Sequence, residues 1–209
     1  MSEQGTLGCF LCKPDEDLVF LRNPAAFALC GLGPIVPWYS IVATSAHSPS
    51  AADYLRNSGD ELLKTLDQAL SIFERMGMPC VVAEHGRVPI CVDTLSADRH
   101  CYHAHLLLFP NVTVPAIDVS ALFGSSTTSA TLLNALRSVP VAGEYFLLAS
   151  GAGEATLFTE PRHVPRQFLR MLVATERGVP QLADWRTTPN ASLARSYASE
   201  LKILAQGVR

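Results

Sequence analysis

The residues with the clearest chemical potential lie in the stretch Arg99–Pro110, which reads Arg-His-Cys-Tyr-His-Ala-His-Leu-Leu-Leu-Phe-Pro. Its short length, its apolar content and its closing proline, which cannot donate to a sheet, predict a buried strand. Side chains alternate along a strand, so His103, His105 and Leu107 are expected on one face, with the two imidazoles about 7 Å apart. At that spacing one imidazole can be held by a metal ion while the next faces a substrate.

A second chemical group is the Cys-x-x-Cys pair formed by Cys9 and Cys12. Such a pair is either half of a metal site or a redox dithiol. A thioredoxin-like dithiol would follow a buried strand and open a helix, but residues 1–8 contain no strand pattern and residues 13–15 indicate a turn. The spacing therefore favours a metal site, for which zinc would need two further ligands. The redox dithiol remains the alternative.

The segment His103–Pro110 resembles the motif of the histidine triad (HIT) superfamily, in which histidines alternate with apolar residues and a proline often follows. The third histidine position is occupied by Leu107. A competing register places Cys101, His103 and His105 at the three positions, and we prefer the first because it puts Pro110 at the usual proline.

Three further segments are similar to a bacterial HIT-like subgroup with a C-terminal extension. They are the Glu-His-Gly at 84–86, the Val-Pro-x-Gln-φ-φ-Arg that begins at Val164, and the Asp-Trp-Arg at 184–186. In the Pro-rich turn before the strand at 39–43, Trp38 stands where relatives have glycine, so we expect a different turn.

The resemblance implies a zinc site. Zinc-bearing HIT relatives and the related galactose-1-phosphate uridylyltransferases hold the metal with a Cys-x-x-Cys pair, a distant histidine and the first motif histidine. Carried over residue by residue, the ligands are Cys9, Cys12, His47 and His103. The next candidate ligands are His85, His100 and His163.

The resemblance also implies that His105 attacks the α-phosphorus of a nucleotide or dinucleoside polyphosphate and forms a nucleotidyl-histidine. The chain would then be a nucleotide phosphate hydrolase or nucleotidyl transferase. Leu107 can neither donate nor accept a hydrogen bond, which predicts a low rate. The alternative is a catalytically inactive, zinc-stabilised HIT domain that binds nucleotide or a protein partner. Gln167 and Arg170 either contact phosphate or a partner subunit, or simply lie on an exposed helix face, which is the more common case.

These side chains would be positioned by an α+β fold. Apolar runs at 18–21, 26–29, 39–43 and 80–83, together with the histidine stretch, predict an antiparallel HIT-like sheet of about five strands. The apolar periodicity across 51–76 predicts one crossover helix. We expect residues 1–112 to form the HIT-like domain and residues 113–209 to form a C-terminal extension packed on the same core.

The extension has its own local signals. A hairpin is expected over 145–148 and 155–158, a short helix near 131–137, a helix that opens at Val164, and a last helix over 190–206 that Asn190 caps.

Composition narrows the classes of function. With 209 residues, 48% of them hydrophobic, the chain is long enough to bury a core, and its formal net charge of −3 argues against a nucleic-acid partner. No apolar run is long enough to cross a membrane, and no signal peptide is recognisable, so we expect a cytoplasmic protein with reduced cysteines. Many HIT domains pair through sheet edges and helices, so a homodimer is one expectation, and the alternative is that the long C-terminal tail covers that edge; light scattering would test it.

Overall fold

The protein was analysed as a computed structural model that describes residues 10–88, 91–92, 100–113, 123–161, 164 and 167–207. Within those residues one eight-stranded antiparallel sheet runs in the order β1-β2-β3-β7-β4-β9-β10-β8, and β5 and β6 form a separate two-stranded sheet. The strands are β1 (Val19–Arg22), β2 (Ala26–Cys30), β3 (Ser40–Thr44), β4 (Cys80–Gly86), β5 (Cys91–Val92), β6 (His100–Cys101), β7 (His105–Pro110), β8 (Phe123–Ser129), β9 (Tyr145–Ser150) and β10 (Ala155–Pro161).

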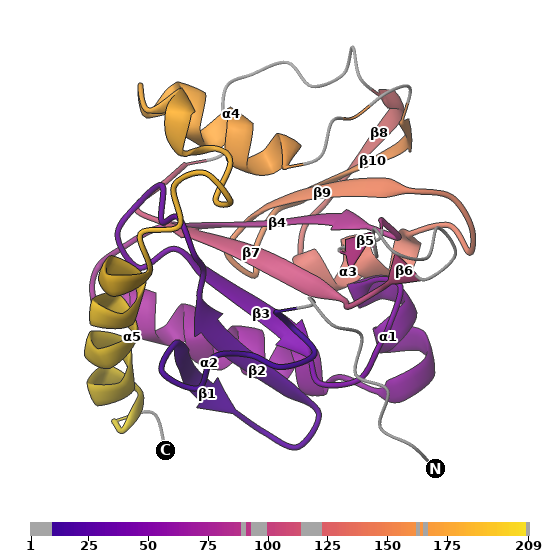
Figure 1. The fold of residues 1–209 in the computed structure, drawn as a ribbon. Coiled ribbons are helices and arrows are strands. Elements are labelled where there is room, and N and C mark those ends of the chain that lie inside the picture. Colours follow the sequence, from indigo (N-terminus) through magenta and orange to yellow (C-terminus); the bar gives the residue numbers. More distant parts are fainter. Residues whose placement is uncertain are drawn as a thin grey trace.

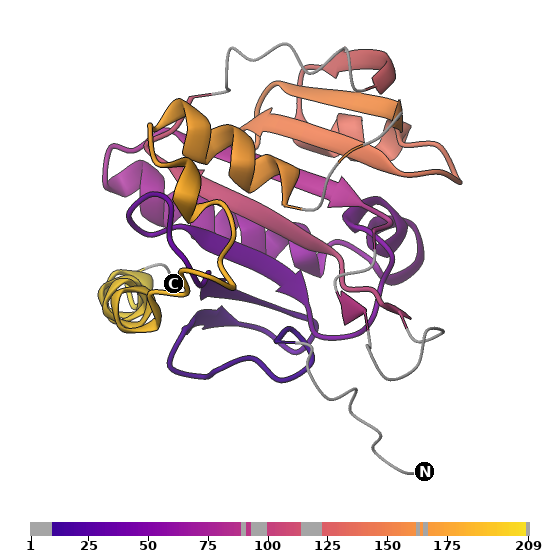
Figure 2. The same cartoon turned by 45° about the horizontal axis from the view of Figure 1, so that its top comes forward.

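Helices lie on both faces of this sheet. Figures 1 and 2 show α2 across one face and α4 across the other, while α5 packs against β1 and β2 beside the end of α2. In the α2 layer, α3 packs against β8 and β10, and α1 packs between α2 and α3. The helices are α1 (Ala51–Ser58), α2 (Glu61–Arg75), α3 (Leu132–Ser138), α4 (Phe168–Glu176), the 3-10 turn η2 (Pro180–Leu182) and α5 (Ala191–Ala205).

The predicted combination of helices with an antiparallel sheet is present, but the expectation of about five strands is wrong. The C-terminal part of the chain adds β9, β10 and β8 to the same sheet, and β9 pairs with β4 from Val81↔Ser150 to Gly86↔Tyr145. Without β9 the buried strand β4 would present unpaired backbone groups at an edge. The division into residues 1–112 and 113–209 remains a prediction.

The hairpins predicted from turn residues are present, whereas two predictions about helices need correction. The pairs β1–β2 and β9–β10 are antiparallel hairpins as predicted. The single helix expected over 51–76 is two helices, because Gly59 between them adopts φ 98°, a conformation that side-chain-bearing residues avoid. Asn190 does occupy the N-cap position of α5, but its side chain makes no capping hydrogen bond.

The turn at Trp38 has an unusual backbone conformation. Trp38 has φ 57°, so it adopts the left-handed conformation that glycine favours, although it carries a bulky side chain. The strain is offset by contacts with α5: Trp38 Nε1 donates to Glu200 Oε2 at 2.8 Å, and the indole packs on Tyr197. The aromatic residue thereby ties the turn before β3 to the last helix.

Glu84 is a buried carboxyl group that joins β4 to α1. Its side chain is 1% exposed; Oε1 accepts from the Ala51 backbone N–H at 2.7 Å, and Oε2 accepts from the Tyr145 hydroxyl. Burial is the main cause that raises the pKa of Glu84 to about 7. The carboxyl group therefore holds the first turn of α1 against the sheet. Its burial costs less free energy when it is protonated than when it is charged.

We predict that Glu84 makes folding less favourable as the pH rises. Because its pKa is higher in the folded chain than when unfolded, its contribution is complete below about pH 4.5 and is lost as the pH rises through about 7. The difference in unfolding free energy is on the order of 3 kcal/mol. Urea unfolding of the wild type and Glu84→Gln at pH 5 and pH 8 would measure it.

Glu84→Gln should lose less stability than the wild type between these two pH values, because glutamine does not ionise. Glu154→Gln, on the exposed turn between β9 and β10, is the matched control and should follow the wild type. An equal loss in wild type and Glu84→Gln would contradict the prediction.

Candidate functional site

The histidine stretch divides at the start of β7. The strand begins at His105, and His103 precedes it, so the expectation that His103, His105 and Leu107 share one face of a strand is wrong for His103. The chain is nevertheless fixed there, because the Thr44 backbone N–H donates to the Ala104 carbonyl at 3.0 Å. His103 can therefore face a different neighbourhood from His105, two residues later.

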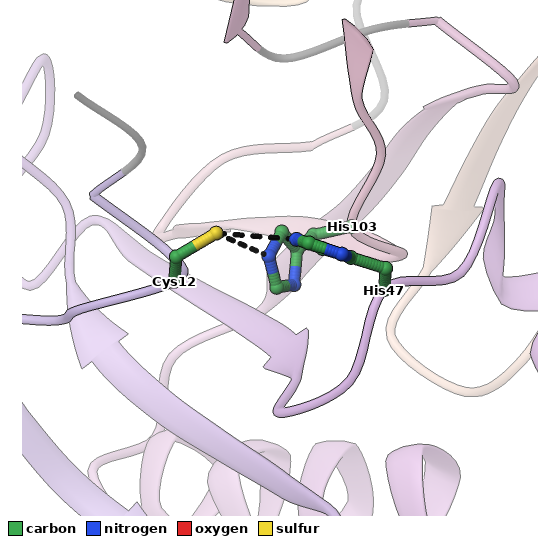
Figure 3. Close-up of side chains that lie close together, drawn as sticks. All are labelled: Cys12, His47 and His103. Carbon is green, nitrogen blue, oxygen red and sulfur yellow. Dashed lines mark hydrogen bonds between the residues drawn. The ribbon is translucent and has the colours of Figure 1, made fainter. Parts of the chain in front are cut away.

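His103 lies with Cys12 and His47, as Figure 3 shows. Cys12 Sγ is 3.2 Å from Nε2 of His47 and 3.2 Å from Nε2 of His103, and all three donor atoms lie within 4.8 Å of one another. The two imidazole rings meet edge to face, with centroids 4.5 Å apart. The N-terminal turn, the loop after β3 and the segment before β7 supply one residue each.

This donor set fits zinc. Zinc–sulfur bonds of about 2.3 Å and zinc–nitrogen bonds of about 2.0 Å in a tetrahedron separate sulfur from nitrogen by roughly 3.5 Å, close to the distances observed. His103 Nδ1 donates to the Thr44 carbonyl at 3.1 Å, which leaves the Nε2 lone pair toward Cys12. Burial, and then the neighbouring His103, lower the pKa of His47, which favours its neutral form.

Three of the four ligands expected from the sequence, Cys12, His47 and His103, therefore lie together. Cys9 lies outside the described residues, so its role as the fourth ligand stays a prediction. Of the other candidate ligands, His85 lies on β4 and is not part of the group, while the side chains of His100 and His163 are likewise outside the described part.

His105 faces a cavity instead. Its Nδ1 donates to the backbone carbonyl of His103 at 2.9 Å, so the proton is on Nδ1 and the lone pair on Nε2. Burial lowers the pKa of His105, although the hydrogen bond to His103 opposes that effect. A neutral imidazole with a fixed tautomer and a free Nε2 is the form that a nucleophile or a general base needs.

The cavity has a volume of about 390 Å³ and lies between the sheet face that carries His105 and the chain segments around α4 and the start of α5. That volume is within the range of small-molecule sites. Four basic side chains and one acidic side chain line it: Lys13, Arg170, Arg186, Arg195 and Asp15. Its apolar wall includes Phe10, Leu29, Ile41, Leu107, Phe168 and Trp185.

Arg170 is a structural part of this wall. It is 4% exposed, and its guanidinium donates to the carbonyls of Gly33, Leu182 and Ala183 at 2.6–2.9 Å while lying over the Tyr39 ring. The expectation that it lies on an exposed helix face is therefore wrong. Its Nη1 is buried without a hydrogen-bond partner among the described residues.

Most of the cavity lining was not identified from the sequence. The pattern at 184–186 pointed to Trp185 and Arg186, but nothing local marks Lys13 or Arg195. The position of Arg195 depends on a contact between distant segments, its 2.7 Å ion pair with Asp15. His85, which also lines the cavity, was considered only as a spare metal ligand.

Comparison with known proteins leaves the family open. No family model matches the chain, and no curated protein does. Among solved structures, the yeast Ap4A phosphorylase Apa2 is similar to this chain with a TM-score of 0.45 and 13% identity, over 93% of this chain and 78% of that one. With a similarity this low, membership of the HIT superfamily remains a prediction. Among the described residues, no helix combines the length and apolar character needed to cross a bilayer.

We predict one zinc ion per chain, held by Cys12, His47 and His103 together with Cys9. Cys12→Ala should lose the metal and lower the unfolding free energy by several kcal/mol, because metal affinity is coupled to folding. Elemental analysis of protein expressed with zinc, combined with thermal unfolding, would measure both effects.

Cys80→Ala is the matched control, since Cys80 is a buried cysteine on β4 outside the group. It should keep its zinc. Almost no zinc in the wild type would contradict the prediction, and a Cys9–Cys12 disulfide in that protein would favour the redox alternative.

Proposed function

We propose that the chain is a nucleotide phosphate hydrolase or nucleotidyl transferase that works through a nucleotidyl-histidine on His105. The observation that carries the proposal is the geometry of His105. Its Nδ1–H is fixed to the His103 carbonyl, which leaves the Nε2 lone pair for a ligand in a basic cavity. The histidine pattern of the sequence supports the same residue.

The lining of the cavity supports a phosphorylated ligand with an apolar or aromatic part. Lys13 supplies positive charge, and Arg186 and Arg195, which are paired with Asp184 and Asp15, add guanidinium groups that can donate to phosphate oxygens. Phe10 and Trp185 pack edge to face, with centroids 5.6 Å apart, and offer aromatic surface on which a nucleobase can stack. A nucleotide or dinucleoside polyphosphate combines both features.

Zinc would be structural in this mechanism. Held by Cys12, His47 and His103, it would fix the segment before β7 and stabilise the fold. The described ligands lie outside the cavity lining, so the chemistry falls to His105 and its neighbours.

Leu107 restricts the reaction. It lies two residues beyond His105, lines the same cavity and offers no hydrogen-bonding group. Departure of a poor leaving group is therefore unassisted at this position, and phosphoanhydrides, whose leaving groups depart as stable anions, are the expected substrates. The same residue favours the second candidate function, an inactive domain that binds nucleotide or a protein partner.

We predict that His105→Ala abolishes turnover of dinucleoside polyphosphates and nucleoside phosphoramidates. Product analysis over a panel of both classes would measure it. Zinc content and thermal stability should stay nearly unchanged, because His105 is not among the grouped ligands. If wild type and His105→Ala hydrolyse every member equally slowly, the enzyme proposal fails, and nucleotide binding by calorimetry becomes the test of the inactive domain.

We also predict that Leu107→His raises the rate. The substitution puts an imidazole into the cavity beside His105, where it can donate to a leaving oxygen, and one such contact is commonly worth about 10²-fold. The gain should be larger for phosphoramidates than for phosphoanhydrides, as measured by kcat. Leu107→Met, which keeps the apolar character, is the control. It should leave the ratio of kcat for phosphoramidates to kcat for phosphoanhydrides as it is in the wild type.

A further inference from the structure

A second imidazole lies level with His105 on the neighbouring strand. Strands β4 and β7 are antiparallel, with Ala83 opposite Leu107, so His85 lies opposite His105 when that register is continued by two residues. Directly opposite side chains share a face of the sheet. His85 and His105 both line the cavity, which confirms that they face the same space.

The ring of His85 lies between the cavity and two neighbouring side chains, Glu144 and Phe146. Its Nε2 is buried and lies 3.6 Å from Oε2 of Glu144, just beyond hydrogen-bond range, and the ring packs edge to face on Phe146. With Nε2 turned to Glu144, Nδ1 is the nitrogen left for a ligand. Burial lowers the pKa of His85, and the Glu144 carboxylate opposes that effect.

The second half of the proposed reaction needs such a group. Once His105 is bonded to phosphorus, its Nε2 lone pair is used and cannot take a proton from the incoming water. Leu107 has no lone pair to offer. A base must therefore come from another element that faces the cavity, and β4 supplies one on the adjacent strand.

We propose that His85 is the general base that activates the acceptor water, with Glu144 as the positioning residue behind it. This inference rests on the proposed function. First, the His105 Nε2 lone pair forms a bond to the α-phosphorus, and the phosphorus–oxygen bond breaks with its electron pair going to the leaving phosphate. Then the water oxygen attacks phosphorus, His85 Nδ1 takes its proton, and the phosphorus–nitrogen pair returns to His105. His85 finally releases the proton to solvent.

Trapping the covalent intermediate tests this assignment. Dinucleoside tetraphosphates with adenine, guanine, cytosine or uracil bases, radiolabelled at the α-phosphorus, are mixed with excess protein and quenched in alkali, which preserves phosphorus–nitrogen bonds. In wild type, protein-bound label should appear and decay. In His85→Gln it should appear with at least the wild-type amplitude and decay about 100-fold more slowly, because loss of a general base costs about 10²–10⁴ in rate.

Variants separate the possible failures. Glu144→Gln should slow the decay by a smaller factor, and it serves as the second test if His85→Gln fails to fold. Glu154→Gln, an identical change on an exposed turn, should decay like wild type. Label that decays equally fast in wild type, His85→Gln and Glu144→Gln would overturn the role of His85 while leaving His105 as nucleophile. No label in wild type, His85→Gln or Glu144→Gln would overturn the proposed function itself.

Discussion

The pairing of β7 with β3 on one side and β4 on the other is the constraint on which the rest of the structure depends. It sets Ile41, Leu107 and Ala83 side by side in one register. Because strand side chains alternate, this register sends His105 and Leu107 to the cavity and Leu106 and Leu108 to the layer that contains α2. A slip of one residue would exchange these two sets and bury the imidazole in the core.

The same alternation sends two neighbouring residues of β4, Glu84 and His85, to opposite faces of the sheet. Glu84 faces α1, where it accepts from the Ala51 N–H, whereas His85 faces the cavity. Strand β4 therefore both anchors α1 through Glu84 and supplies His85 to the cavity. Glu84, next to His85 in the sequence, is not its partner; the carboxylate that lies near His85 is that of Glu144, which immediately precedes β9.

The sequence could predict what depends on short-range signals and on motif spacing. Turn residues mark the β1–β2 and β9–β10 hairpins, and the positions of Cys12, His47 and His103 were anticipated from their resemblance to a ligand pattern. The addition of β9 to β4 could not be predicted, because it joins segments about 60 residues apart and no local feature fixes that pairing. The basic lining of the cavity was missed for the same reason: Lys13 and Arg195 line one cavity only after α5 has packed beside β1.

His103 has two contacts that link otherwise separate parts of the molecule. Its imidazole lies against Cys12 and His47, while its backbone carbonyl accepts the proton-bearing Nδ1 of His105. The orientation of the His105 ring therefore depends, through a single peptide unit, on a residue that also contacts a thiol and a second imidazole. A change at Cys12 or His47 that moved His103 would therefore also move the carbonyl that holds His105 Nδ1, although neither residue lines the cavity.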